Sequence, residues 1–290
     1  MKVLITGVNG FIGSNIYKGL KSKQDILGTS QSINSKICDK YISCDLTDKE
    51  KLREVLKEHN DIDVIVHCAA LAHNKGDDLS KDRFMKVNYE VTKDLVDFSN
   101  EFLKLKQFIF LSTISVYGER MDKNLYVEDD KCYPKSPYAV AKKMSEEYII
   151  KNCKSNYYIL RLAPVYSKEF RLNIKRRSEI KGFNYVVGTG ENKLSLCNVE
   201  NIVSVVDKII DKRVFENEIY NISDKDIYTY NDLLNMNKVS NIKVWIPKLF
   251  LKLLYSLNEI SAKKQFIQEN SIKLISDNIY PSNKLYQSIK

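Results

Sequence analysis

Long apolar runs, paired cysteines and histidine clusters are all absent from this chain of 290 residues. No stretch approaches the ~18 apolar residues of a membrane-spanning helix, so we expect no transmembrane segment. The six cysteines are scattered without a C-x-x-C pair, which disfavours a disulfide framework and a zinc site. The three histidines have no ligand partner at useful spacing, so we expect no metal. The N-terminal run reaches Gly7 too early for a signal peptide, and we expect a cytoplasmic protein.

The charge is unbalanced toward cations, since 46 Lys and Arg against 37 Asp and Glu leave +9. Such an excess suits an anionic partner: nucleic acid, a membrane surface or a phosphorylated small molecule. No basic block is interleaved with aromatic residues, so we expect no specific nucleic-acid binding. With 43% hydrophobic and 29% charged residues, the composition is that of a globular protein and excludes a disordered or fibrous one.

Short β-branched runs alternate with helical patterns over the first 165 residues. The alternation predicts an α/β fold, a Rossmann-like doubly wound parallel sheet with helices on both faces. After Pro164 the rhythm becomes irregular, which indicates a smaller C-terminal substrate lobe. We therefore expect a first domain over 1–165 and the lobe over 166–290, with segments near 196–224 returning to the first domain.

A glycine-rich turn follows the first expected strand and opens the first expected helix. Gly7, Gly10 and Gly13 form G-x-x-G-x-x-G. The first glycine permits a tight turn, the second a close approach of backbone to a pyrophosphate, and the third close packing of helix on strand. Backbone N–H groups at the helix start would then face the phosphates. The turn predicts dinucleotide binding.

The identity of the dinucleotide stays open between NAD and NADP. A carboxylate after the second strand would select NAD, but that region reads Thr29-Ser30-Gln31-Ser32. Small polar residues there accommodate a 2′-phosphate, yet no arginine is present to pair with it. Asp45 follows the third strand, where it either reaches an adenine amino group or only flanks the next helix.

Tyr138 and Lys142 lie four residues apart in an expected helix, so their side chains share one face. A free phenol has a pKa of ~10, and a fixed cation beside it lowers that value toward a usable base. The strand before this helix ends in Ser112-Thr113, at the edge where ligands of doubly wound sheets bind. Thr113 and Tyr138 are therefore expected to serve the same substrate oxygen.

Together these features resemble the extended short-chain dehydrogenase/reductase superfamily, in its NAD(P)-dependent nucleotide-sugar epimerase/dehydratase/reductase family. The resemblance covers nearly the whole chain and rests on the glycine turn, Asp45-Leu46, His67 to Ala70, Val87-Asn88, Ser112 to Gly118, Tyr138 with Lys142, and Arg161 to Tyr166.

The resemblance implies roles for individual residues. Thr113 and Tyr138 match the catalytic hydroxyl and tyrosine, and Lys142 would hold the nicotinamide ribose. Asn88 would support the loops beside the cofactor, and Pro164 would flank the nicotinamide. The candidate cofactor contacts are Gly7, Asn9, Gly10, Phe11, Ile12, Gly13, Ser30, Asp45, Leu46, Ala69, Ala70, Asn88, Ser112, Tyr138, Lys142, Pro164 and Val165. The candidate substrate contacts are Ala72, His73, Thr113, Ser115, Asn173 and Lys193.

Departures from the family pattern narrow the function. Dehydratases of this family carry an Asp-Glu pair directly after the threonine, where this chain has Ile114 and Ser115. We therefore expect no 4,6-dehydration, and a UDP-sugar type 4-epimerase or 4-keto reductase remains, with Tyr138 as acid/base. The family's diphosphate-binding arginine falls on Leu194, and the candidate substitutes are Lys193 beside it, or Arg176 and Arg177.

The expected partners are a nucleoside-diphosphate sugar and a second copy of the chain. The helices over 81–103 and 138–151 resemble those that form the homodimer interface in this family. The altered positions in the substrate lobe motivate an alternative, a non-catalytic NAD(P)-binding sensor or scaffold protein.

A basic amphipathic helix is expected over 248–257, with Phe250, Leu253, Leu254 and Leu257 on one face. Such a face either contacts a membrane surface or covers core as a lid. The helical spacing favours the lid.

Overall fold

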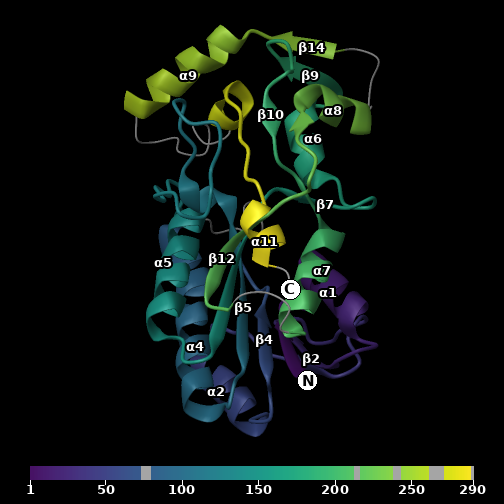
Figure 1. The fold of residues 1–290 in the computed structure, drawn as a ribbon, viewed down its shortest axis with the longest axis vertical. Coiled ribbons are helices and arrows are strands. Elements are labelled where there is room, and N and C mark those ends of the chain that lie inside the picture. Colours follow the sequence, from purple (N-terminus) through teal and green to yellow (C-terminus); the bar gives the residue numbers. More distant parts are fainter. Residues whose placement is uncertain (73–79, 212–215, 238–242, 261–270, 289–290) are drawn as a thin grey trace.

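A parallel sheet of seven strands in the order β12-β6-β5-β4-β1-β2-β3 forms the centre of the molecule (Figure 1). This computed structural model describes residues 1–72, 80–211, 216–237, 243–260 and 271–288. Every neighbouring pair of strands in the sheet runs parallel, which confirms the predicted fold class. The strands are β1 (Lys2–Thr6), β2 (Asp25–Ser30), β3 (Tyr41–Ser43), β4 (Val64–His67), β5 (Gln107–Thr113), β6 (Asn156–Leu162) and β12 (Glu218–Ile222).

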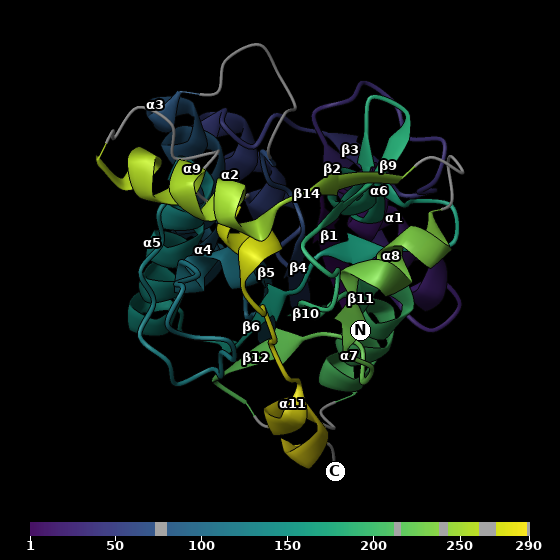
Figure 2. The ribbon, with the colours of Figure 1, turned by 90° about the horizontal axis from the view of Figure 1, so that it is seen from above.

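Helices cover both faces of this sheet (Figure 2). On one face α1 (Phe11–Leu20) and α7 (Val199–Ile210) bury residues such as Ile16 and Val206 against the strands. On the other face α2 (Lys49–Glu58), α4 (Val91–Phe102) and α5 (Pro137–Asn152) do the same with Leu56, Leu95 and Ile149. Because parallel strands are buried on both faces, their sequences read as continuous apolar runs.

The long helix expected over 81–103 is interrupted. It consists of α3 (Lys81–Phe84), a π-helical stretch η1 (Met85–Glu90) and α4. Asn88 lies within η1 and is buried. The wider π-helical turn re-aims this side chain toward the loop after β4, and such local widenings are frequent at functional sites.

The C-terminal half forms a lobe above the carboxyl ends of the strands. Its elements are β7 (Val165–Tyr166), α6 (Leu172–Ser178), β8 (Glu179–Ile180), β9 (Phe183–Val187), β10 (Lys193–Leu194), β11 (Cys197–Asn198), β13 (Tyr228–Thr229), α8 (Tyr230–Met236), β14 (Lys243–Ile246) and α9 (Lys248–Ile260). The last helix, α11 (Asn283–Ser288), returns to the sheet and packs beside β12. Trp245 lies in strand β14, just before α9. Within the described residues, no helix has the length and apolarity needed to cross a membrane.

The chain returns to the central sheet after β11. Strand β12 pairs with β6 at the edge of the sheet, and α7 packs beside α1. Residues 199–222 therefore lie with the first unit in space, while the boundary at 165 stays a prediction.

A buried ion pair joins β5, β6 and α5. The Arg161 guanidinium donates to both carboxylate oxygens of Glu146, at 3.0 and 2.8 Å. Ser112 Oγ donates to the same carboxylate at 2.6 Å, and Arg161 also donates to the Glu128 carbonyl at 3.1 Å. The Arg161 guanidinium lies 4.8 Å from the centre of the Tyr117 ring. Each partner is buried, so loss of Glu146 leaves Arg161 without its carboxylate, and loss of Arg161 leaves Glu146 with the more distant Lys143 Nζ at 3.5 Å.

We predict that Glu146→Gln or Arg161→Met alone lowers the free energy of unfolding by about 3–5 kcal/mol, because one buried charge loses its closest charged partner. Glu146→Leu combined with Arg161→Met is expected to lose less than the sum of the single losses. Urea denaturation of the three variants measures this.

The exposed pair Arg53–Glu101 provides the control, since Glu101→Gln is expected to change stability by about 1 kcal/mol or less. Strictly additive losses for Glu146 and Arg161 would show that the two charges are not coupled.

Candidate active site

The glycine turn after β1 forms a close-fitting cradle. Gly7 has φ +66°, and a Cβ there would lie 2.8 Å from the Ala69 Cα. A Cβ on Gly13 would lie 2.4 Å from the Gly7 carbonyl oxygen. Helix α1 begins after Gly10 without a capping side chain and without an acidic residue in its first turn. Its first N–H groups, from Phe11 onward, therefore suit a pyrophosphate, and the cradle fits a dinucleotide.

Both ring nitrogens of His67 form hydrogen bonds beside this cradle. Its Nδ1 is 2.7 Å from Thr6 Oγ1, and its Nε2 is 3.1 Å from Thr92 Oγ1. Thr92 donates its own proton to the Asn88 carbonyl, so it accepts from Nε2, and Thr6 donates to Nδ1. Burial lowers the pKa of His67 well below its usual value. A neutral imidazole with a fixed tautomer holds the ends of β1 and β4 together.

Asn88 holds the loop after β4 from within η1. Its side chain accepts from the Leu71 N–H at 2.8 Å and donates to the Leu71 carbonyl at 3.1 Å. These bonds occupy the amide, so Asn88 positions the loop rather than facing a ligand itself. Ala69 is half-buried beside Gly7, and Ala70 and Ala72 are exposed on the same loop. The predicted substrate contact His73 lies outside the described residues.

Asn9 ties the glycine turn to the loop after β2. Its Nδ2 donates to Ser30 Oγ at 3.0 Å, and its Oδ1 accepts from Ser35 Oγ at 2.6 Å. Asp45 is exposed, and its Oδ1 accepts from the N–H and the hydroxyl of Thr47. Leu46 beside it is buried. The contacts of Asp45 are those of a residue that flanks the next helix, α2. Its contact with an adenine amino group stays a prediction.

Thr113 and Tyr138 meet at the carboxyl end of β5. Thr113 is the last residue of β5, and its Oγ1 accepts from the Ser115 N–H at the start of η2 (Ile114–Tyr117). Tyr138 lies in the first turn of α5, which Ser136 caps. The two side chains are hydrogen-bonded. Burial raises the pKa of Tyr138 to about 12, and the bond to Thr113 opposes that shift.

Lys142 corrects one expectation. It lies one turn after Tyr138, but its Nζ donates to the Leu111 carbonyl at 2.8 Å and lies 4.4 Å from the centre of the Phe110 ring. Burial lowers the pKa of Lys142 to about 8, against the opposing influence of Cys68 and Glu146. The expected lowering of the Tyr138 pKa is not found, because burial raises that pKa and the opposing cause is the bond to Thr113 rather than the charge of Lys142.

Two other predicted contacts have partners or positions of their own, and their contacts with ligands stay predictions. The buried hydroxyl of Ser112 donates to Glu146 and belongs to the interior ion-pair network. Lys193 is exposed on β10, whereas its neighbour Leu194 lines the pocket described next. Successive side chains of a strand point to opposite sides, which explains why Lys193 is turned away.

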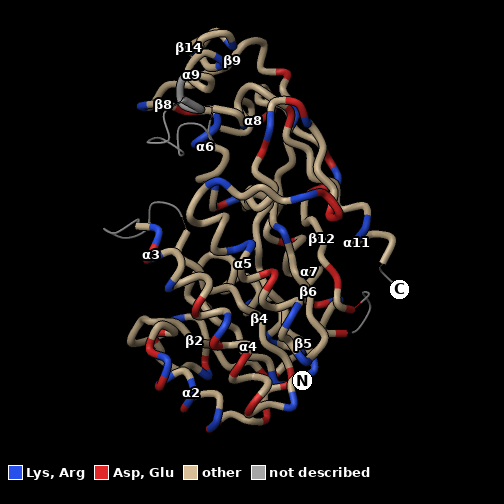
Figure 3. Tube along the Cα trace, turned by 90° about the vertical axis from the view of Figure 1, so that its left-hand side faces the viewer, with Lys and Arg blue, Asp and Glu red and all other residues tan. Residues whose placement is uncertain are grey.

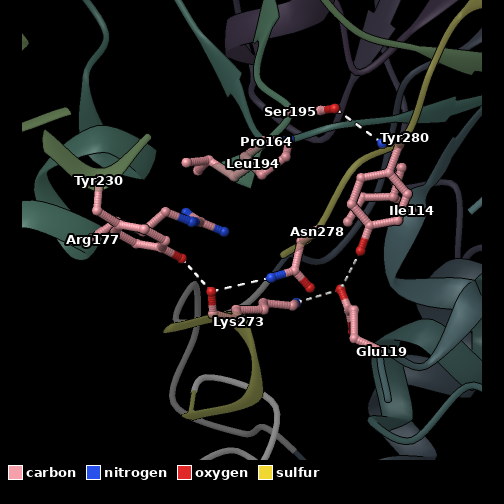
Figure 4. Close-up of a pocket in the computed structure, with 10 residues that line it drawn as sticks. All are labelled: Ile114, Glu119, Pro164, Arg177, Leu194, Ser195, Tyr230, Lys273, Asn278 and Tyr280. Carbon is pink, nitrogen blue, oxygen red and sulfur yellow. Dashed lines mark hydrogen bonds and ion pairs between the residues drawn. The ribbon is translucent and has the colours of Figure 1, made fainter. Parts of the chain in front are cut away.

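A pocket between the lobe and the sheet is lined in part by Ile114, the residue after Thr113 in the sequence (Figure 4). Its walls come from six separate parts of the chain: Ile114, Glu119, Pro164, Arg177, Leu194, Ser195, Tyr230, Lys273, Asn278 and Tyr280. Glu119 accepts from the Tyr280 hydroxyl at 2.9 Å and pairs with Lys273 at 3.3 Å. Arg177 supplies a second cation from α6, and its Nη1 donates to the Asn173 carbonyl at 2.9 Å.

The remaining predicted residues surround this pocket without lining it. Asn173 donates to the Val165 carbonyl at 2.8 Å, which holds α6 against β7. Val165 and Ser115 are buried. Phe11 stacks on Phe170 with ring centres 4.2 Å apart, joining the glycine turn to the lobe.

Sequence reasoning missed Glu119, Lys273 and Tyr280. Glu119 directly follows the Ser112–Gly118 stretch, so its place near the site could have been predicted from the sequence. Lys273 and Tyr280 come from the tail more than 150 residues later, and no local pattern brings them to Glu119.

The fold and the cradle define a Rossmann-like dinucleotide-binding protein. The chain belongs to the NAD dependent epimerase/dehydratase family, whose model matches residues 3–223. The predicted resemblance is thereby confirmed, as is the cofactor class, NAD or NADP, at the level of the family.

Among curated relatives, a UDP-glucose 4-epimerase of Vibrio cholerae is 25% identical over 268 residues, 87% of this chain and 81% of that enzyme. A dTDP-D-glucose 4,6-dehydratase of Dictyostelium discoideum is 28% identical over 282 residues, 84% of this chain but only 62% of that longer enzyme. The crystal structure of a UDP-glucuronic acid 4-epimerase from Bacillus cereus, in complex with NAD, has a TM-score of 0.69. It is 25% identical and covers 85% of this chain and 86% of its own. These relatives support a nucleotide-sugar epimerase/dehydratase-family function.

We predict that Gly13→Ala weakens NAD binding by roughly tenfold or more, because its Cβ would displace the Gly7 carbonyl that shapes the cradle. Isothermal titration with NAD measures the loss. Gly182→Ala is the control for a glycine outside the cradle: no atom lies within 4 Å of the added Cβ, and the strain from its φ of +83° falls away from the NAD site. Equal NAD affinity of the wild type and Gly13→Ala would contradict the cradle.

The buried Lys142 predicts a pH dependence of stability. An unfolded lysine, with a pKa of ~10.4, keeps a proton that the folded protein loses near pH 8. Stability therefore rises with pH from about 8 to about 10.4, by on the order of 2–3 kcal/mol from this residue. Lys142→Met is expected to remove this rise in urea denaturation measured across that range.

Lys151→Met, at an exposed position near the end of the same helix, is expected to keep the wild-type rise. A Lys142→Met variant with an unchanged pH dependence would mean that Lys142 is not desolvated.

Proposed function

We propose that this protein inverts C4 of nucleoside-diphosphate sugars, as a UDP-sugar type 4-epimerase. The hydrogen bond between Thr113 and Tyr138 carries the proposal. It brings two hydroxyls from β5 and α5 together at the carboxyl edge of a parallel sheet, where ligands of such folds bind. The glycine cradle opens at the same edge, after β1.

In this proposal Tyr138 would act as phenolate, ionised by the positive charge of Lys142 and of a bound cofactor, because burial alone raises its pKa to about 12. The Tyr138 Oη then accepts the proton of the sugar C4 hydroxyl and later returns it to the same oxygen. Thr113 positions Tyr138 by their hydrogen bond at the C4 oxygen. A bound nicotinamide supplies the acceptor and donor for the C4 hydrogen, so that the cycle has no net redox change. With a pKa of about 8, Lys142 is protonated at neutral pH and can serve as a cation beside the cofactor ribose.

The proposal excludes 4,6-dehydratase activity, in which the C6 hydroxyl of the hexose is eliminated as water. Ile114 is buried and Ser115 carries no charge, so neither can provide the acid and base that follow the threonine in dehydratases. Glu119 is the carboxylate among the pocket-lining residues, and Lys273 and Tyr280 already engage it. Loss of water from a dTDP- or UDP-hexose, detected by mass spectrometry, would overturn this part.

The substrate diphosphate needs cations, and the pocket offers two. Arg177 and Lys273 line it, whereas the predicted Lys193 does not. We propose that Arg177 and Lys273 take the place of the arginine that the family has where this chain has Leu194.

A 4-keto reductase would use the same hydroxyls, and the retained cofactor separates the two activities. An epimerase reuses its cofactor in every cycle and should hold NAD through purification, as the NAD complex of the Bacillus cereus 4-epimerase suggests. An empty site that takes up NADPH would favour the reductase. Homodimerisation through α4 and α5 stays a prediction.

We predict that Tyr138→Phe lowers kcat on the true UDP-sugar by about 10²–10⁴-fold, the usual contribution of a positioned acid/base. Turnover is measured by following epimer formation in a nuclear magnetic resonance spectrum. NAD retention is expected to persist, since the cradle is untouched.

Tyr148→Phe is the matched control, because Tyr148 lies on the same helix and hydrogen-bonds Asp97 away from the pocket. Undiminished turnover by Tyr138→Phe would end the proposed mechanism.

A further inference from the structure

Helix α9 presents an apolar face to solvent. Leu249, Phe250 and Leu253 are 69%, 55% and 57% exposed. Leu249 and Leu253 are four residues apart and lie side by side on the helix, with Phe250 flanking them. Single exposed apolar residues are ordinary, but a contiguous group of large ones marks an interaction surface.

The opposite face of α9 is anchored in the lobe. Tyr255 is buried in a cluster with Tyr185, Val187, Ile272 and Ile275, and Leu251, one turn earlier, packs against it. The helix is thus held in place, and its outward face is not an accident of loose packing.

This arrangement corrects the predicted lid. The face expected to cover core included Phe250 and Leu253, and both are exposed. Leu251 and Tyr255 pack against the core of the lobe instead. The Leu257 side chain is not among those that the structure describes. Helix α9 has apolar residues on both faces, and their spacing alone does not determine which face turns toward the core. The sequence therefore predicted the wrong face.

Strand β14 extends the apolar surface into α9. Trp245 is 63% exposed, and its indole N–H donates to the Gly188 carbonyl at 2.8 Å. The ring's single polar atom is thereby bound within the protein, and the exposed part of Trp245 is apolar. Gly188 also lies beside Lys248 at the start of α9, so strand and helix form one surface. Figure 3 shows α9 and β14 together at one end of the molecule.

Lysines are the charged residues of β14 and of the first two turns of α9, while Glu259 follows at the end of α9 and Glu191 lies between Gly188 and Asn192. The segment 243–256 contains Lys243, Lys248 and Lys252 and no acidic residue. Lys248 donates to Asn192, whereas Lys243 and Lys252 are exposed and have no ion-pair partner among the described residues. Aliphatic and aromatic side chains bordered by lysines match the surface of a bilayer that contains anionic lipids.

We propose that α9 and β14 dock this protein on an anionic lipid surface, with Trp245, Leu249, Phe250 and Leu253 entering the interface and Lys243 and Lys252 facing the lipid phosphates. A second copy of the chain fits less well. A two-fold contact through this face would bring the same lysines together, and segment 243–256 offers no acidic counterpart. The docking surface is separate from the pocket lined by Ile114, so it extends the proposed function rather than depending on it.

Co-sedimentation of the full chain with vesicles tests the proposal. Vesicles of phosphatidylcholine and phosphatidylglycerol in about a 3:1 ratio are expected to pellet the protein, and phosphatidylcholine alone far less. Replacing Leu249, Phe250 and Leu253 together by Ser should lower the partition coefficient by roughly tenfold or more. Lys243→Ala with Lys252→Ala should lower it by about fivefold per lysine on the anionic vesicles.

Matched controls use exposed residues elsewhere. Ile227→Ser removes an exposed apolar side chain outside the surface, and Lys151→Ala with Lys154→Ala removes two exposed charges. Both are expected to bind vesicles like the wild type. The lysine variants keep the apolar face, so they carry the test even if the triple serine variant fails to fold.

Two results would overturn the proposal. One is equal pelleting of the wild type with both vesicle compositions, or no loss in the Lys243/Lys252 variant. The other is a wild-type dimer, seen by sedimentation velocity without vesicles, that the triple serine variant splits, since a second copy would then cover the face.

Discussion

The buried carboxylate of Glu146 holds the catalytic edge of this molecule together. It accepts from Arg161 on β6 and from Ser112 on β5, while its own backbone is part of α5. Thr113 follows Ser112 directly, and Tyr138 lies two turns before Glu146 on the same helix. The distance between the two hydroxyls is therefore fixed by an interior contact that no substrate touches. If Glu146 adopted another rotamer, α5 would shift and the hydroxyls of Thr113 and Tyr138 would separate. The Glu146–Arg161 ion pair is therefore the constraint on which the site depends.

Burial dominates the electrostatics of the site. It raises the pKa of Tyr138 to about 12 and lowers that of Lys142 to about 8, so each group is shifted toward its neutral form. The Lys142 Nζ donates to the Leu111 carbonyl. In the proposed function, a bound cofactor would supply the positive charge that favours ionisation of Tyr138.

Much of the fold and the order of the site along the chain were predictable, because both are local. Short local patterns predict the apolar strands β1, β4 and β5 and the turn from Gly7 to Gly13, because each pattern is compatible with one backbone conformation. Packing sets what spacing along the chain leaves open. Ser112 and Lys142 hydrogen-bond interior partners and Lys193 does not line the pocket, while their contacts with ligands stay predictions. Helix α9 buries Leu251 and Tyr255 rather than Phe250 and Leu253. Lys273 and Tyr280 reach Glu119 only through the tertiary fold, which no spacing along the chain encodes.

The central claim is that Tyr138 works beside a nicotinamide that removes and returns the hydrogen of sugar C4. A UDP-hexose deuterated at C4 tests it most directly, with the product examined by nuclear magnetic resonance in ordinary water. The account predicts a C4 epimer that keeps its deuterium, because the hydrogen is carried by the cofactor and not exchanged with solvent. An epimer that has lost the label would contradict it, as would failure to form any epimer from UDP-hexoses by a protein that retains NAD.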